Sequence, residues 1–353
     1  MQNLLNKFLT RYFSNEESIY FGLLLLSSFL FIYLFGSILL PVLVSIVVAF
    51  LLNGLLSTLR SINLSHRISL FLTLFIFFSF YVSLFFLLPS LGKQINSLIQ
   101  SMPLIAIAFQ ENLELLSQNY PEIFSEDGVN TLFANLTSQF SSLLNNALGQ
   151  LAGTISFVIN TVFFVVLVPI MVFFFLKDKE VLLPMLTVLL PTKRGFMNTV
   201  FSEMNQQLFN YVTGKFIEMI IVGSVSYVVF LILGLPYAVL ISILVGLSVI
   251  IPFFGAFLVT IPVLLVGLYE WGLSDTFYWL LALYLIIQIL DGNVLVPVLF
   301  SSRNNLHPVI ILIAVLFFGG IWGFWGLFFA IPLATFIKAI FNAWPQPKDV
   351  NSS

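Results

Sequence analysis

Long stretches without a charged residue dominate the pattern of apolar and polar positions, and they predict helices that cross a lipid bilayer. Residues 18–59 contain no Asp, Glu, Lys or Arg, and about 20 apolar residues are enough for one crossing. Gly36 and Pro41 punctuate this stretch, which indicates two spans joined tightly. A third span is expected over 68–91 and a fourth over 151–176.

The C-terminal part is almost continuously apolar. Four further spans are expected here, over 216–234, 237–268, 276–299 and 307–337, and the stretches 237–268 and 291–306 could each be a re-entrant hairpin instead. The sequence therefore predicts an all-α, polytopic integral membrane protein with about eight transmembrane helices and with broken or re-entrant helices in the C-terminal half.

Helix-breaking residues at membrane depth are the reason to expect broken helices there. The residues are Pro236, Pro252, Gly255 and Pro297. Each proline removes one helical hydrogen bond, and lipid tolerates the freed backbone groups only where protein or a water-filled cavity satisfies them. Transporters often build a mid-membrane site from such broken helices. For any single proline, a kink that only shapes packing is the simpler interpretation.

Two segments are polar overall but carry apolar residues at helical spacing. In 93–150 the first stripe is Ile95, Leu98, Ile99 and Met102. In 181–212 the stripe is Met197, Phe201, Met204, Leu208 and Tyr211. We expect amphipathic helices, the first segment outside or along the membrane and the second at the membrane surface or packed against the helix bundle.

The distribution of basic residues predicts which way the chain faces, because cytoplasmic loops are enriched in Lys and Arg. One side would hold Lys7, Arg11, Arg60, Arg67, Lys177, Lys179, Lys193, Arg194, Lys215, Lys338 and Lys348, and the other only Lys93 and Arg303. Both termini and Glu270 are therefore expected in the cytoplasm. The predicted parts are the first three spans (1–92), an external segment (93–150), the fourth span (151–176), a cytoplasmic segment (177–215), a transmembrane core (216–340) and a cytoplasmic tail (341–353).

Composition supports the bilayer as the solvent. The chain of 353 residues is 60% hydrophobic and 8% charged, against roughly 25% charged in an average soluble chain. A net charge of −2 does not suggest nucleic acid as a partner. The absence of cysteine excludes disulfides, thiolate catalysis and Cys metal sites, and no cofactor or metal is expected.

Several short motifs, taken in order, resemble one family over essentially the whole chain. They are Pro169 with 173–178, then 234–238, 251–255, 293–297, His307 with Pro308, and Gly319, Gly320, Gly323 and Gly326 before 330–332. Together they resemble the autoinducer-2 exporter family, which includes the PerM-type permeases. The resemblance implies a homo-oligomeric, multi-pass transporter of the bacterial inner membrane. Members are linked to export of the signalling molecule autoinducer-2 and others to sodium or proton antiport.

Asp291 is the strongest candidate for a role in transport, because an acid inside a membrane span is a functional hypothesis by default. Many members of the family carry Glu-Asn where this chain reads Asp291-Gly292-Asn293. With Gln288 and Asn293 it could form an ion-coupling site and carry a proton. Paired with Arg303, it would stay charged and lock a gate. Alternatively, Asp291 only ends a helix at a re-entrant turn.

Other charged residues near the ends of spans are weaker candidates. Lys215 and Glu218 could pair along one helical face, and an anchoring role is the simpler interpretation. Lys177 and Asp178 resemble a helix end at the interface, with a gating role left open by their fit to the family pattern. The four glycines Gly319, Gly320, Gly323 and Gly326 predict close helix packing, with contact between subunits as the alternative.

Two functions of other classes compete with transport. An intramembrane protease lacks support because there is no His-Glu-x-x-His helix, and Asp291 has no evident second acid within a span. We therefore expect no enzyme. A membrane scaffold or assembly factor is the non-enzymatic alternative. No Walker-type ATPase motif is present, so export of a small polar metabolite, driven by an ion gradient or by its own gradient, ranks ahead of sodium or other cation/proton antiport.

Overall fold

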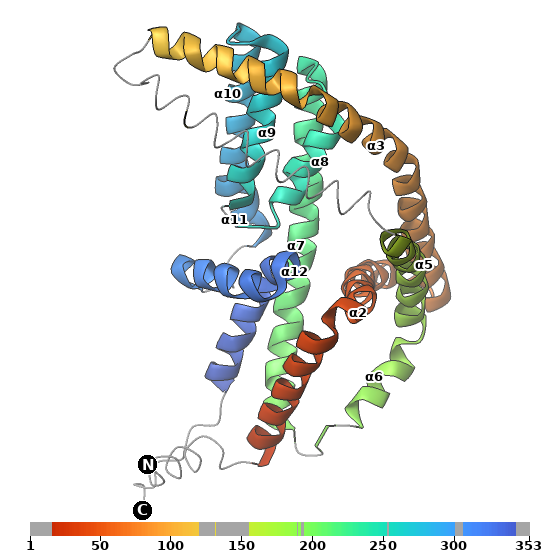
Figure 1. Cartoon of the computed structure of the whole chain (residues 1–353). Helices are drawn as coiled ribbons and strands as arrows, with labels where there is room; N and C mark the ends of the chain where they lie inside the picture. Colours follow the sequence, from red (N-terminus) through yellow and green to blue (C-terminus); the bar gives the residue numbers. More distant parts are fainter. Residues whose placement is uncertain are drawn as a thin grey trace, which may run out of the picture. The chain divides into compact units, whose positions relative to one another are not determined.

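The fold is built from helices. A computed structural model describes residues 16–119, 131, 155–188, 190–191, 194–252, 254–300 and 306–343. Its elements are α2 (Glu16–Ser61), α3 (His66–Asn119), α5 (Ile155–Lys177), α6 (Lys179–Thr187), α7 (Gly195–Leu233), α8 (Ala238–Ser248), α9 (Phe254–Trp271), α10 (Asp275–Leu290), the π-helix η1 (Asp291–Leu295), α11 (Val296–Leu299) and α12 (Pro308–Ala343) (Figure 1).

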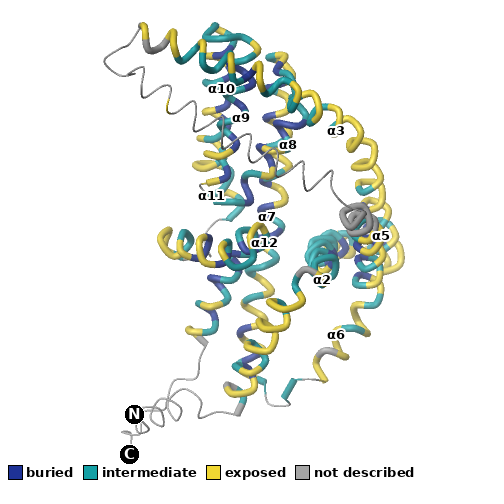
Figure 2. Tube along the Cα trace, viewed as in Figure 1, coloured by how far each residue is buried: buried dark blue, intermediate teal, exposed yellow. Residues whose placement is uncertain are grey.

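Length and composition confirm a polytopic all-α membrane protein. In the described part of the chain, 7 helical stretches are long and apolar enough to cross a membrane, and Phe163–Lys177 and Ala238–Ser248 are shorter apolar helices. Exposed residues are spread over all the labelled long helices (Figure 2), and many of them are large and apolar, for example Phe86 at 79%. Such a surface suits lipid rather than water.

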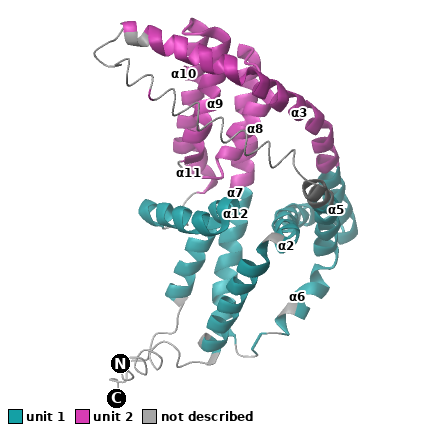
Figure 3. Ribbon diagram, in the orientation of Figure 1, with its two compact units in different colours: residues 1–78, 163–213, 304–353 teal, residues 79–162, 214–303 magenta. Residues whose placement is uncertain are grey.

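The helices divide into two compact units (Figure 3). Unit 1 comprises residues 1–78, 163–213 and 304–353, and unit 2 comprises residues 79–162 and 214–303. Three of the described helices, α3, α5 and α7, contribute residues to both units.

In unit 1, the start of α2 packs against the start of α7. Met197 and Val200 are buried together with Phe21, and the Glu17 carboxylate accepts a hydrogen bond from the Met197 N–H at 2.8 Å. That N–H belongs to the first turn of α7, which has no intrahelical acceptor. The stripe in 181–212 was expected either at the membrane surface or packed against the helix bundle. Its N-terminal part, at Met197, packs against another helix.

Helix α12 folds back on itself in unit 1. Gly323 has φ 57° and ψ −133°, a conformation that residues with a Cβ rarely adopt. The two halves pack together, since Ala314 and Ala330 share one apolar cluster and a Cβ at Gly326 would lie 1.8 Å from the Phe318 carbonyl oxygen. The single span expected over 307–337 is thus a sharply broken helix.

In unit 2, the Gly-Leu-Pro sequence turns the chain between α7 and α8. Gly234 has φ 76°, its N–H bonds to the Leu231 carbonyl and the Leu235 N–H to the Phe230 carbonyl. These two bonds form a Schellman motif, which closes a helix and is commonly followed by proline, here Pro236.

The stretch 237–268, for which the sequence left a single span and a hairpin open, folds as a hairpin of α8 and α9. The two helices pack against each other, and the corner needs Gly255, where a Cβ would lie 1.7 Å from the Ser248 carbonyl oxygen. Both open ends of the hairpin lie along α3. Gln94 accepts from the Leu240 N–H at 3.0 Å, and Asn112 lies beside Gly272 after α9.

Helix α3 is continuous through Pro89 and Pro103, whereas the sequence led us to expect a span that ends near residue 91 and a separate external helix. Within unit 2, Leu98 and Met102 of its apolar stripe pack against the core that contains Ile105.

Candidate functional site

A buried ion pair lies within α7. The Lys215 Nζ is 2.9 Å from Glu218 Oε2 and donates to Oε1 at 3.1 Å. The two residues are only 6% and 2% exposed. The pairing predicted from the three-residue spacing is confirmed. Because α7 already begins at Gly195, the pair lies in the middle of a helix rather than at the start of a span.

The end of α8 provides a third partner for the lysine. Lys215 Nζ donates to the Val249 carbonyl oxygen at 2.7 Å, and the last carbonyl groups of a helix lack intrahelical donors. Close approach of α7 and α8 makes this contact possible, because a Cβ at Gly246 would lie 2.8 Å from the Met219 carbonyl oxygen and 3.2 Å from the Gly223 Cα. Two glycines on facing helices therefore position the lysine.

Asp291 joins this pair through electrostatic interaction with both Lys215 and Glu218. It begins the π-helical turn, in which the Val296 N–H bonds to the Asp291 carbonyl oxygen five residues before it. The side chain is half-buried, and Oδ1 is buried without a hydrogen-bond partner among the described residues. Lys215, Glu218 and Asp291 are called the charged cluster below.

Glu218 is a second buried acid near Asp291. We expected no second acid within a span near Asp291, yet Glu218 is among the most deeply buried side chains of the described residues. The two acids are 73 positions apart in the printed sequence, on α7 and at the start of η1, so sequence spacing gave no sign of their proximity.

Comparison with known proteins now adds to this geometry. The family described as "AI-2E family transporter" matches residues 22–346. The chain belongs to this family. It is 42% identical over 266 residues to "Putative permease PerM" of Escherichia coli (strain K12), which covers 74% of each chain. It is 27% identical over 258 residues to "Putative transport protein YueF" of Bacillus subtilis (strain 168), covering 72% of this chain and 69% of that protein. The resemblance is confirmed, and the protein is a membrane transporter at this level of description.

Gln288 and Asn293 of this AI-2E family transporter lie on either side of Asp291. Gln288 Nε2 is buried without a hydrogen-bond partner among the residues that the structure describes. Asn293 is exposed and donates to the Ile289 carbonyl oxygen at 2.9 Å. The Gln288 side chain lies one helical turn before Asp291 and interacts with the Tyr284 hydroxyl, whereas Asn293 bonds to a backbone carbonyl one turn before it. Arg303, the other predicted member of the site, lies outside the described residues.

The predicted hinge prolines differ in their surroundings. Pro236 follows the Schellman motif, Pro252 lies in the α8–α9 corner, and Pro297 lies in the first turn of α11. At Pro297 the missing N–H coincides with the π turn, so the helix continues from α10 to α11 instead of breaking.

The other predicted residues lie in unit 1, away from a buried charge. Lys177 Nζ lies 5.6 Å from the centre of the Phe173 ring. Asp178 forms the bend between α5 and α6, where its carbonyl oxygen accepts the Val181 N–H. The glycines Gly319, Gly320, Gly323 and Gly326 surround the break in α12. A gating role for Lys177 and Asp178 stays a prediction.

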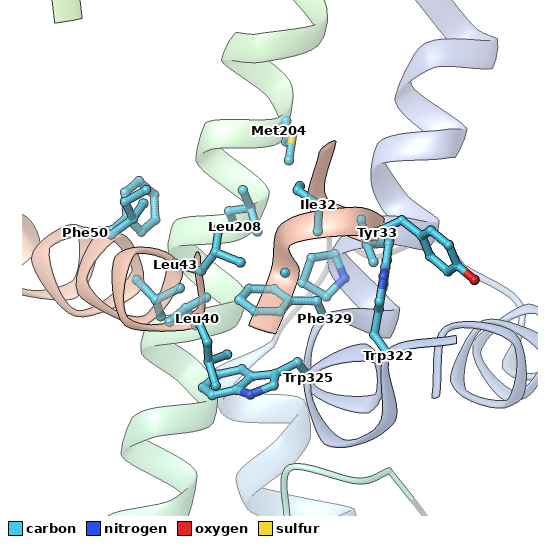
Figure 4. A pocket seen from close by; sticks show the side chains of 16 residues that line it. Ile32, Tyr33, Leu40, Leu43, Phe50, Met204, Leu208, Trp322, Trp325 and Phe329 are labelled. Carbon is cyan, nitrogen blue, oxygen red and sulfur yellow. The ribbon is translucent and has the colours of Figure 1, made fainter. Parts of the chain in front are cut away.

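Unit 1 of the transporter also contains an apolar cavity of about 640 Å³. Figure 4 shows Leu40 and Leu208 beside it, with the rings of Trp322, Trp325 and Phe329. None of its lining side chains is charged, so it offers no group for binding an ion. No group of three His, Asp or Glu residues that could hold a metal ion is present among the described residues.

Sequence reasoning missed two members of the site. The Val249 carbonyl is a backbone group, which no residue pattern marks. Phe300 lies with its ring 5.4 Å from Lys215 Nζ, and the only sequence signal for this contact is Gly214 beside the lysine. Two acids and one base held in a helix bundle can exchange a proton or a small cation while the lysine balances one negative charge.

Proposed function

We propose that the protein is an ion-coupled secondary transporter of the bacterial inner membrane, which exports a small polar metabolite and binds its coupling ion at the charged cluster. The observation that carries the proposal is the burial of Lys215 and Glu218 beside Asp291. Buried charges in a spanning helix are expensive and mark ion or substrate pathways. A buried pair is also weak as a device for stability alone.

The charge balance supports a monovalent coupling ion. Two carboxyl groups face one lysine, so with both acids ionised the cluster carries one uncompensated negative charge. A proton or a sodium ion would neutralise it. Asp291 Oδ1, which is buried without a hydrogen-bond partner among the described residues, and the Glu218 carboxylate offer oxygen ligands of the kind that both ions accept.

Cation/proton antiport is a second candidate, since the same cluster could bind a proton and a cation in alternation. A scaffold function would leave the buried charges without a role. Glu218 is ion-paired to a lysine, whereas the two acids of an aspartyl protease share a proton. The presence of Glu218 near Asp291 therefore does not favour a protease. The partners proposed are the bilayer, a small polar solute, protons or sodium, and other copies of the chain.

Proteoliposomes with an internal pH dye test the proposal. Sodium, potassium or lithium gradients are imposed on wild type, Asp291→Asn, Glu218→Gln and the control Glu114→Gln, whose carboxylate is exposed on α3. Release of autoinducer-2 from cells that produce each variant is measured in parallel. We expect both cluster variants to lose transport and Glu114→Gln to retain it.

The pattern of loss separates the candidates. Export that depends on the cluster supports the proposal, and a cation-driven proton flux without added metabolite identifies antiport instead. Undiminished transport in both Asp291→Asn and Glu218→Gln would refute an ion-coupling role for the cluster.

A further inference from the structure

The aromatic ring of Phe300 lies beside the lysine of the charged cluster. Its centre lies 5.4 Å from Lys215 Nζ, within the range in which a cation is attracted to a ring face. Lys215 is then surrounded by Glu218, the Val249 carbonyl and this ring. The Phe300 ring attracts the Lys215 ammonium group without neutralising its charge. The ring can therefore move away from the lysine at a moderate cost in free energy.

The position of the ring depends on a residue without a side chain. A Cβ at Gly214 would lie 2.7 Å and 2.9 Å from two carbon atoms of the Phe300 ring, closer than carbon atoms approach in proteins. Glycine in the middle of α7 costs about 1 kcal/mol in helix propensity. Glycine at position 214 therefore leaves the space beside Lys215 that the Phe300 ring occupies.

Phe300 and Asp291 are carried by the same run of helix. Phe300 directly follows α11, where its N–H bonds to the Val296 carbonyl oxygen, and α11 continues from η1, which begins at Asp291. A π turn holds one residue more than the α-helical turn it replaces, and each residue of an α-helix turns by about 100°. Relaxing η1 to an α-helical turn would therefore rotate the segment that carries Phe300 relative to α10.

We propose that Phe300 gates the charged cluster. The coupling ion reaches Lys215 and Glu218 after the Phe300 ring moves away from Gly214, and a change in η1 moves the segment that carries the ring. This inference rests on the proposed function. It assigns Phe300 as a positioning residue that controls access, and Asp291 as the acid whose movement accompanies opening.

Chemical labelling of Glu218 measures access directly and needs no knowledge of the metabolite. The purified full chain is treated with a water-soluble carbodiimide and an amine, and the peptide that contains Glu218 is quantified by mass spectrometry. The variants are Phe300→Ala, Phe300→Tyr, Gly214→Ala and Phe86→Ala. Phe300→Tyr retains a ring, Gly214→Ala displaces it, and Phe86→Ala removes an exposed ring elsewhere.

The expected result follows from the strength of the contact that is lost. A cation–ring contact contributes about 0.5–2 kcal/mol, so Phe300→Ala should raise the labelling rate about 2- to 30-fold. Gly214→Ala should change it in the same direction, whereas Phe300→Tyr and Phe86→Ala should resemble wild type. If Phe300→Ala does not fold, Gly214→Ala against wild type decides the question.

Equal labelling of Glu218 in wild type, Phe300→Ala and Gly214→Ala, including no labelling in any of them, would overturn the gate. The transport assay keeps this failure apart from failure of the proposed function. Transport that needs Asp291 and Glu218 while labelling is unchanged leaves the function and removes the gate. If labelling rises as expected but Asp291→Asn transports normally, the gate at Phe300 is supported and the ion-coupling role is refuted.

Discussion

The buried pair of Lys215 and Glu218 predicts a characteristic pattern of stability. Lys215→Met leaves the Glu218 carboxylate, 2% exposed, without its cation and the Val249 carbonyl without its donor. Removal of one partner of a buried pair costs about 3–5 kcal/mol. Glu218→Gln keeps the shape and removes the charge, which leaves the lysine as the unpaired ion. We expect a loss of free energy of unfolding in the same range for each single variant.

The double variant Lys215→Met with Glu218→Gln separates burial from simple contact. With both charges gone no ion is left buried, so its free energy of unfolding should exceed that of either single variant, in a double-variant cycle with a coupling of about 0.5–3 kcal/mol. Reversible unfolding in mixed micelles, followed by tryptophan fluorescence, measures all four proteins. Single-variant losses below about 1 kcal/mol, the size found for solvent-exposed pairs, would show that water reaches the pair and that our account of its burial is wrong.

Three further predictions concern the packing of the helices, and thermal unfolding of the purified protein checks each. Gly255→Ala should destabilise the protein by about 1–3 kcal/mol or prevent folding, because the added Cβ meets the Ser248 carbonyl oxygen. Gly36→Leu should stabilise it more than the exposed control Gly92→Leu, since both gain helix propensity but only Gly36 lines the apolar cavity; equal shifts would count against a fillable cavity. Glu17→Ala should lower stability by about 1.5–3 kcal/mol through loss of the charged acceptor for the Met197 N–H, and an unchanged melting temperature would contradict that cap.

The sequence was informative where local chemistry decides the structure. The apolar runs predict spanning helices, and Gly234 with Pro236 marks a helix end because its Schellman motif involves neighbouring residues. The ion pair of Lys215 and Glu218 follows from helical spacing alone. The functional weight of Asp291 also follows from its apolar neighbours, although its role in transport stays a prediction.

Contacts between distant segments could not be predicted in the same way. The amphipathic stripe of α3 fits both a membrane surface and a protein core, and no local pattern shows that Leu98 and Met102 contact the core of unit 2. Glu218 was assigned an anchoring role because nothing local shows that α7 extends before Lys215 or that η1 lies nearby. At Gly323 the glycine pattern suggested a packing surface, whereas the positive φ makes it a corner.

The α8–α9 hairpin and the broken α12 offer a second crossing pattern beside the eight spans expected from the sequence. If each of these two segments returned to the side from which it started, six crossings would remain, and both termini would still share one face. Glu270 would then face outward, and a cysteine introduced there into this cysteine-free chain should react with an impermeant reagent. The sequence position of Arg303 would fall on the inner side. Lys93 would then be the one basic residue expected outside, which agrees with the rule that basic residues concentrate in the cytoplasm.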